Sequence, residues 1–124
     1  MSVPHYEIQI TQGTEYQFRF DVVVDGAEQD LTTWPNLWHA AKKSAMQADA
    51  DAVYVKVLFD GVERVSGETQ RAEVTILPAD TAGLEEGMRH TLVGDVGGLD
   101  ADSNPHQLMT LGITVNPRIR RSND

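Results

Sequence analysis

Apolar and polar residues alternate along most of this chain, and this period of two limits its fold more than any other feature of the sequence. The longest example spans residues 15–24. Its apolar members occupy every second position: Tyr16, Phe18, Phe20, Val22 and Val24. Because successive side chains of a β-strand point to opposite faces, the segment is predicted to be a half-buried strand with an aromatic inner face. Asp25-Gly26 then supplies a turn.

Five further segments show the same pattern and are predicted to be strands. They span residues 6–11, 53–60, 71–76, 88–96 and 109–115, the fourth being the weakest. In the second segment, the side chains expected to face the core are those of Val53, Val55, Val57 and Phe59. Pro78 and Pro117 cannot donate a hydrogen bond to a sheet, so strands are expected to end before them. After Pro78, Asp80 is expected to cap one helical turn, and Leu84 to close the end of the core.

Short strands separated by turn residues are typical of an all-β sandwich or barrel. The chain has 124 residues, which suits one domain, and it contains no internal repeat or low-complexity linker. We therefore expect one β-sandwich domain over residues 1–117, followed by a basic C-terminal tail over residues 118–124.

Charge is distributed unevenly along the chain. The formal net charge is -9 and the pI is about 4.7, which argues against nucleic acid as the main partner, because phosphate contacts need clustered Lys and Arg. The C-terminal tail is the exception, with Arg118, Arg120 and Arg121. No apolar run approaches the ~20 residues of a membrane helix, and residues 1–5 lack the features of a signal peptide. The protein is expected to be made in the host cytoplasm and to bind no membrane.

No group of residues has the spacing of a catalytic or metal site. The absence of cysteine excludes disulfides and thiolate metal sites. Four scattered histidines are expected at the surface or at strand edges: His5, His39, His90 and His106. No spacing selects a nucleophile with a base and an orienting group. We therefore expect no enzymatic activity, no catalytic residue, no metal and no cofactor.

Three segments imitate functional motifs without their essential residues. Residues 100–104 look like the start of a calcium-binding loop, but Pro105 and Leu111 occupy the positions that need Gly and Glu. An acidic hairpin loop is expected there instead. Residues 94–98 are expected to form a loop that is no phosphate cradle, since the lysine and the following helix are missing. The adjacent Glu85-Glu86 cannot flank a glycosidic bond at the required separation.

Two tryptophans suggest molecular recognition. Trp38 lies where many β-sandwiches place a core tryptophan, so it is expected in the core. Trp34 precedes Pro35 and is expected to be partly exposed. An exposed aromatic ring can anchor a protein interface or stack on a sugar.

The order of strand and turn signals resembles a known family. The signals are the break Thr11-Gln12-Gly13-Thr14, the turn Asp25-Gly26 followed by Asp30-Leu31-Thr32, the stretch Ile76-Leu77-Pro78-Ala79-Asp80-Thr81-Ala82-Gly83-Leu84, and the ending Ile113-Thr114-Val115-Asn116-Pro117. Together they resemble the small immunoglobulin-like domains of tailed-phage virion proteins, similar to the N-terminal domain family of baseplate upper proteins. The resemblance implies an immunoglobulin-like antiparallel β-sandwich of about seven strands. Arg89 departs from the family pattern, which often has a tyrosine there.

Residues 36–52 carry conflicting signals. Residues 40–48 are good helix formers and Asn36 is a suitable cap, so local propensity favours a helix. The resemblance implies a strand over residues 37–44, which would place Trp38, Ala40 and Lys42 on one face. We predict the strand and keep the helix as the alternative.

The resemblance also implies a function. It indicates a structural virion protein that binds other particle proteins in multiple copies, as a capsid decoration, neck, tail or baseplate component. The alternative from another class is a carbohydrate-binding β-sandwich module that uses Trp34 and loop residues. Residues 116–124 and residues 1–5 are expected to be arms that reach a neighbouring subunit, and a homo-oligomer is a further expectation. The expected partner-binding residues are Trp34, Arg118, Ile119, Arg120 and Arg121.

Overall fold

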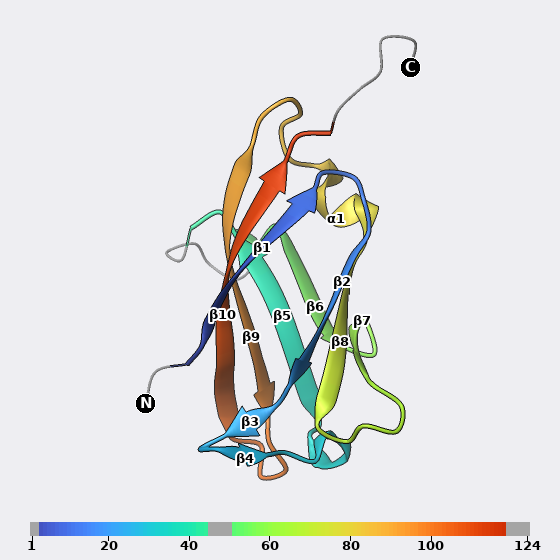
Figure 1. Ribbon diagram of the computed structural model, residues 1–124, viewed down its shortest axis with the longest axis vertical. Helices are drawn as coiled ribbons and strands as arrows, with labels where there is room; N and C mark the ends of the chain where they lie inside the picture. The colour runs from blue at the N-terminus through green and yellow to red at the C-terminus, as the bar shows by residue number, and fades with distance from the viewer. Residues whose placement is uncertain (1–2, 45–50, 119–124) are drawn as a thin grey trace.

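The computed structural model describes residues 3–44 and 51–118, which fold mostly into β-strands (Figure 1). The strands are β1 (His5–Thr11), β2 (Tyr16–Asp21), β3 (Val23–Val24), β4 (Ala27–Glu28), β5 (Asn36–Lys42), β6 (Tyr54–Leu58), β7 (Gly61–Arg64), β8 (Arg71–Ile76), β9 (His90–Leu99) and β10 (Pro105–Asn116). Among the described residues, η1 (Leu31–Thr33) and α1 (Pro78–Ala82) are short helical turns. The prediction of an all-β protein is confirmed.

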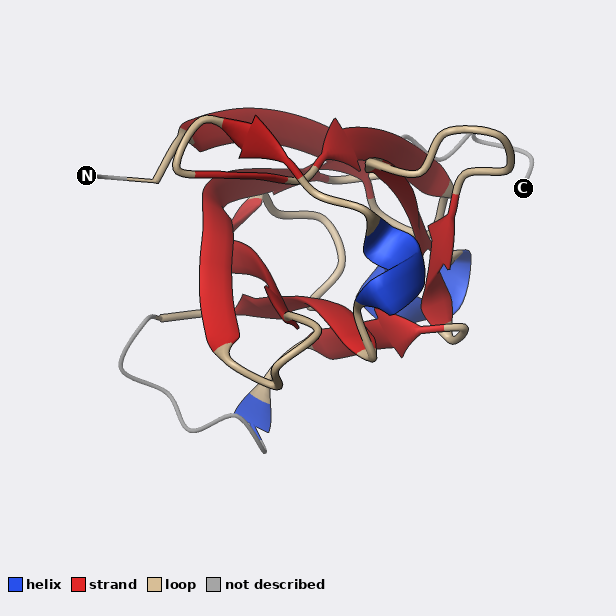
Figure 2. Cartoon of the chain, turned by 90° about the horizontal axis from the view of Figure 1, so that it is seen from below, coloured by secondary structure: helices blue, strands red, loops and turns tan. Residues whose placement is uncertain are grey.

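Eight of the strands form one sheet in the order β1-β10-β9-β5-β6-β7-β8-β2. Neighbouring strands run antiparallel except in the β1–β10 and β6–β7 pairs, which are parallel. The sheet curls round until it forms a nearly closed ring of strands, seen from one end in Figure 2. Its two end strands, β1 and β2, pair with one neighbour each and not with one another. We call the open line between β1 and β2 the seam.

The predicted strand over residues 15–24 is present as β2 and β3, and its apolar face points inward as expected. Phe20 and Val22 are buried, while the intervening Asp21 is exposed. Asp25 and Gly26 then close the β3–β4 hairpin with φ values of 52° and 80°. Two successive positive φ angles suit a two-residue hairpin turn that follows the right-handed twist of the strands.

The conflict over residues 36–52 is resolved in favour of a strand. β5 pairs with β9 on one side and with β6 on the other. These two ladders satisfy its backbone groups, so tertiary pairing overrides the helix propensity of the alanines and lysines. The inner face of β5 carries Leu37, His39 and Ala41. Trp38 is half-buried on the opposite face, so the expectation that it lies in the core is wrong. The part of this segment over residues 45–50 lies outside the described residues.

The predicted inner face of the segment over residues 53–60 is wrong. Tyr54 and Lys56 are buried, whereas Val55 is 53% and Phe59 67% exposed. The inverted face is stable because both inward-pointing polar groups have partners inside, as described below. A buried polar atom with a hydrogen-bond partner avoids most of the cost of leaving water.

Residues 94–98 are not the loop that we expected, because they lie in the middle of β9. The glycines allow two tryptophan rings to pack directly on the strand. A Cβ atom at Gly97 would come within 2.6 Å of the Trp38 ring, and one at Gly98 within 2.8 Å of the Trp34 ring. Glycine in a strand commonly marks such a close approach.

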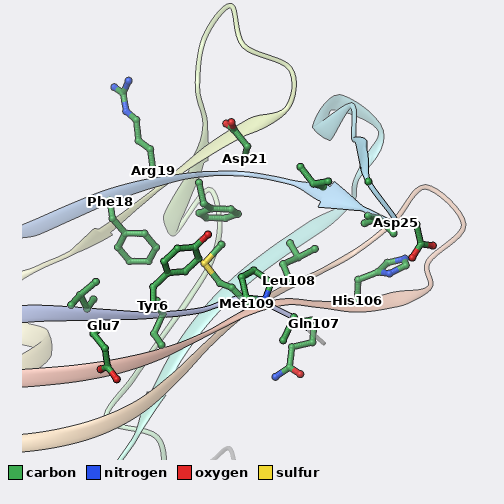
Figure 3. Close-up of a pocket in the computed structure, with 18 residues that line it drawn as sticks. Tyr6, Glu7, Phe18, Arg19, Asp21, Asp25, His106, Gln107, Leu108 and Met109 are labelled. Atoms are coloured by element: carbon green, nitrogen blue, oxygen red, sulfur yellow. The ribbon is translucent and has the colours of Figure 1, made fainter. Parts of the chain in front are cut away.

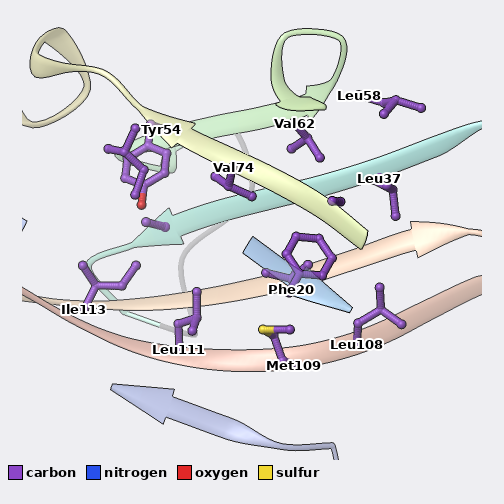
Figure 4. Close-up of a cluster of buried hydrophobic side chains, with 14 of the residues drawn as sticks. Phe20, Leu37, Tyr54, Leu58, Val62, Val74, Leu108, Met109, Leu111 and Ile113 are labelled. Carbon is purple, nitrogen blue, oxygen red and sulfur yellow. The ribbon is translucent and has the colours of Figure 1, made fainter. Parts of the chain in front are cut away.

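Apolar side chains fill the interior of the ring, and Figure 4 shows part of this cluster. Trp34 belongs to the core with only 2% of its surface exposed, so the expectation that it is partly exposed is wrong. At one end of the ring, α1 and Leu84 close the core as predicted, with Leu84 6% exposed. The Oδ2 atom of Asp80 accepts a hydrogen bond from the Leu77 backbone N–H at 2.6 Å and so caps the turn.

Candidate functional site

The seam holds a groove of about 920 Å3 that leads from the surface to the core. Figure 3 shows the Tyr6 and Phe18 rings lying between β1 and β2, with Met109 behind them. Tyr6 is 53% exposed, whereas Met109 is 7% exposed, so the groove extends from the surface of the sheet to the buried core. Its apolar lining comprises Val3, Pro4, Tyr6, Ile8, Phe18, Phe20, Val23, Val24, Leu108, Met109 and Leu111.

Local structure explains why the seam stays open. The chain turns between β1 and β2 at Gly13, which has a φ of 75°, and the Thr14 backbone N–H donates to the Thr11 carbonyl at 3.1 Å. Beyond this turn, β1 pairs along its whole length with β10, and β2 pairs along its whole length with β8. Within the part of the chain that the structure describes, each strand therefore has one edge without a strand partner, which is the arrangement that accepts an added strand.

The rim of the groove is predominantly acidic. Glu7, Asp21 and Asp25 line it together with a single arginine, Arg19. The Arg71 guanidinium donates to Asp21 at 2.8 Å and holds the pKa of that carboxyl below its usual value. The Glu7 side chain is 73% exposed and accepts from the exposed His5 ring. The groove thus combines an apolar floor with negative charge at its mouth.

A second group of polar residues lies inside the ring, on β5 and β6. His39 is fully buried, which corrects the expectation of surface histidines. Its Nδ1 atom lies 2.8 Å from the Asp95 carbonyl oxygen, and its Nε2 atom 2.8 Å from the Tyr54 hydroxyl. A carbonyl can only accept, so Nδ1 carries the proton and the Tyr54 hydroxyl donates to Nε2. Both ends of the imidazole are satisfied in its neutral form.

Burial determines how these groups titrate. Loss of hydration lowers the pKa of His39 from 6.5 to about 4, and the nearby Lys56 charge acts in the same direction. Burial also raises the pKa of the Tyr54 hydroxyl well above its usual value, and the Asp80 charge adds to this effect. Neither side chain is ionised near neutral pH, so the pair forms a fixed internal hydrogen bond.

Polar contacts also tie α1 to the ring of strands. The Nζ atom of Lys56 lies 2.6 Å from the Oδ2 atom of Asp80, and their side chains are 9% and 17% exposed. The buried Gln12 amide donates to the carbonyls of Thr81 and Leu84 at 3.2 and 2.7 Å. These groups bind one another, and none of them lines the groove. These contacts hold α1 against the ring of strands.

The structure does not bring together the residues that the sequence suggested for partner binding. Trp34 is buried beside Gly98, near the beginning of β10. Arg118 is exposed and follows the other end of β10, close to Gly13. Ile119, Arg120 and Arg121 lie outside the described residues. A buried Trp34 has no accessible face with which to anchor a partner.

The N-terminal residues that the structure describes are not a free arm. Val3 and Pro4 line the groove, and the Pro4 carbonyl accepts from the Thr110 backbone N–H at 3.0 Å. His5 is the first residue of β1, and its Nδ1 atom lies 2.7 Å from the Thr110 hydroxyl. The expectation of an arm is therefore wrong for residues 3–5, because pairing with β10 begins there.

Residues 100–104 form the hairpin loop between β9 and β10, as predicted. The Asp100 carboxylate accepts from the backbone N–H groups of Asp102 and Asn104, both at 2.9 Å. It also lies 2.8 Å from Nε2 of His106, the main reason why the pKa of Asp100 is lowered. Within residues 3–44 and 51–118, no three His, Asp or Glu side chains are placed to hold a metal ion. No helix in those ranges has the length and apolar character needed to cross a bilayer.

Sequence reasoning missed the groove although it identified the strands that border it. Tyr6 and Phe18 were expected on inner faces, which the structure bears out only in part: Phe18 is half-buried and Tyr6 is exposed. Alternation fixes the face of each residue within a strand, but not which strands become neighbours. The position of the seam depends on which strands pair with β1 and β2. The alternating pattern does not predict these pairings.

Comparison of the chain with protein-family models gives no match, and no curated protein matches it significantly.

Proposed function

We propose that this protein is a non-enzymatic structural protein that binds other proteins through the groove at the seam. The observation that carries the proposal is the groove itself, where an apolar floor lies between two strand edges that have no strand partner among residues 3–44 and 51–118. Such edges bind extended segments by backbone hydrogen bonds, while side-chain pockets provide selectivity. The ionisable groups of the interior are engaged with one another, which favours binding over chemistry.

The resemblance to virion domains directs this proposal to a phage-like particle. In that setting the protein is a structural component of the capsid surface, neck, tail or baseplate, and its partners are other particle proteins. We also propose that the ring is an immunoglobulin-like sandwich whose halves are β1-β10-β9-β5-β6 and β7-β8-β2. The parallel β1–β10 pair and the short, two-residue β6–β7 pairing, where the chain passes from one half to the other, support this division.

The carbohydrate-binding alternative depended on an exposed Trp34, and the structure does not provide one. Trp34 is 2% exposed, and the Trp38 ring is packed against Gly97. A sugar-stacking platform needs an accessible aromatic face. Tyr6 is exposed in the groove, but it is not the residue on which the carbohydrate-binding alternative rested.

The test is co-purification of the tagged, full-length protein with intact particles, followed by cross-linking from the groove. A photo-reactive side chain replacing Tyr6 should cross-link to a particle protein. The same group replacing Val93, an exposed residue of β9, is the matched control and should give little cross-linking. Absence of the protein from purified particles, or equal cross-linking from both positions, would contradict the proposal.

A further inference from the structure

We infer that the groove at the seam binds the C-terminal tail of a second copy of this chain, with Ile119 as the apolar anchor. The inference rests on the proposed function and deepens it by naming a partner. It depends on three observations: the open strand edges, the charge of the rim, and the distance between the groove and the place where the tail begins.

The sequence of the tail fits an added strand. Side chains of an extended segment alternate between two faces. In Arg118-Ile119-Arg120, placing Ile119 towards the floor of the groove therefore directs both arginines to its mouth. The backbone of such a segment can pair with the open edge of β1 or of β2. The isolated isoleucine, which has no apolar neighbour within the tail, then gains the surroundings of Phe20 and Met109.

The charges of the two surfaces are complementary. The tail has three arginines and one aspartate, so the rest of the chain is even more acidic than the net charge of -9. At the groove, Glu7, Asp21 and Asp25 outnumber Arg19. Arg19 is paired with Glu73 and Asp21 with Arg71, each at 2.8 Å, so the acidic excess at the rim rests on Glu7 and Asp25. Opposite charges at an interface speed association and fix its register.

Chain length keeps Ile119 of the same molecule away from the part of the groove beside Met109. Ile119 is three residues beyond Asn116, the last residue of β10, so it reaches about 10 Å from there when fully extended. Met109, on the groove floor, lies seven residues back along the same strand, which is about 23 Å. Ile119 of the same copy therefore cannot reach Met109, whereas the tail of a second copy has no such restriction.

The first experiment measures the mass of the full-length protein by sedimentation equilibrium over a range of concentrations. We expect reversible self-association that weakens with added salt, because exposed charges are screened. Ile119→Asp and Tyr6→Arg should each weaken association by at least about tenfold, which corresponds to about 1.4 kcal/mol. Val93→Arg introduces the same charge at an exposed site away from the groove and should leave association unchanged.

The second experiment exchanges charges between the two surfaces. Glu7→Lys at the rim and Arg120→Glu in the tail should each weaken association, and a chain with both changes should recover much of it. Glu63→Lys, at an exposed position of β7, is the matched control and should neither weaken association nor rescue Arg120→Glu. If Tyr6→Arg does not fold, the charge exchange still tests the inference, because it does not use that variant.

A wild-type protein that remains monomeric at all concentrations would overturn the inference, as would association that Ile119→Asp leaves unchanged. Weakening by Val93→Arg equal to that by Tyr6→Arg would also overturn it, because association would then not involve the groove. A monomeric protein that still co-purifies with particles and cross-links from Tyr6 would leave the proposed function standing with a different occupant. The two proposals can therefore fail separately.

Discussion

Within the ring, His39 shows how one residue controls a polar interior. Its ring contacts the Phe18 ring edge-to-face at a centroid distance of 5.4 Å, and it lies 5.3 Å from the Tyr54 ring. Both nitrogens are hydrogen-bonded when the ring is neutral. An additional proton would place a buried cation near Lys56, which is why the folded state favours the neutral form.

This preference predicts a pH dependence of stability. The pKa of His39 is about 4 in the folded state, against 6.5 without burial, so the unfolded chain binds the proton more tightly. The contribution to the free energy of unfolding is complete above pH 6.5 and is lost as the pH falls towards 4. It amounts to about 2 kcal/mol between pH 7 and pH 5.

Urea unfolding at pH 7 and pH 5 measures this effect. His39→Asn keeps a donor for the Asp95 carbonyl but cannot titrate, so it should lower stability at pH 7 and lose less on acidification. His5→Asn removes an exposed histidine and should retain the wild-type loss. An identical loss of stability in wild type and His39→Asn would show that His39 does not cause it.

Phe20 tests the inner face of β2. It is 7% exposed, and Phe20→Asp would bury a carboxylate without a partner, which costs several kcal/mol. We expect this variant to be unfolded or to melt far below wild type in a thermal scan followed by circular dichroism. Gln17→Asp adds the same charge on the exposed face of β2 and should change the Tm little. Wild-type melting of Phe20→Asp would mean that the inner face is assigned wrongly.

At the scale of the elements, β6 shows that polar partners can invert a strand. Lys56 faces inward because Asp80 on α1 meets its ammonium group, and its aliphatic stem packs against Gly61. Val55, which the alternating pattern placed in the core, faces outward instead. The ion pair thus joins the middle of the sheet to the helical turn that closes one end of the ring.

A double-mutant cycle tests this ion pair. Lys56→Met preserves the stem but leaves Asp80 without its cation, and removing one partner of a buried pair costs about 3–5 kcal/mol. Asp80→Asn still offers an oxygen to the Leu77 N–H. We therefore expect the Lys56→Met/Asp80→Asn double variant to recover part of the stability lost in Lys56→Met, as measured by urea unfolding. Purely additive losses would show that the two side chains do not interact.

The close packing of Trp38 on Gly97 leads to a prediction about β9. Gly97→Ala would place a Cβ atom 2.6 Å from the Trp38 ring, so the ring must move or the strand must shift. Overpacking of this kind costs about 1–3 kcal/mol. Gly83→Ala is the control, because no atom lies within 4 Å of its added Cβ. If both substitutions lower the Tm equally, the packing of Trp38 on Gly97 is not what requires a glycine.

At the scale of the whole molecule, the described fold ends where pairing ends. β10 stops at Asn116, and Pro117, which cannot donate to a ladder, follows it. Truncation after Asn116 should therefore leave the Tm nearly unchanged while abolishing self-association and weakening binding to particles. Thermal melting and sedimentation equilibrium of the truncated protein check both parts. Failure to fold would show that the tail belongs to the ring, and unchanged association would show that it does not reach a partner.

The sequence alone determined that the protein is all-β, where most strands run, and which face of β2 and β10 is apolar, because these properties depend on local alternation and on turn residues. The resemblance, and not local propensity, predicted that β5 is a strand. Tertiary structure decided the face of β6, the burial of Trp34 and His39, and the position of the seam. Each of these depends on a partner far away in the sequence: Asp80 for Lys56, Gly98 for Trp34, Tyr54 and Asp95 for His39, and β10 and β8 for the strands that border the groove.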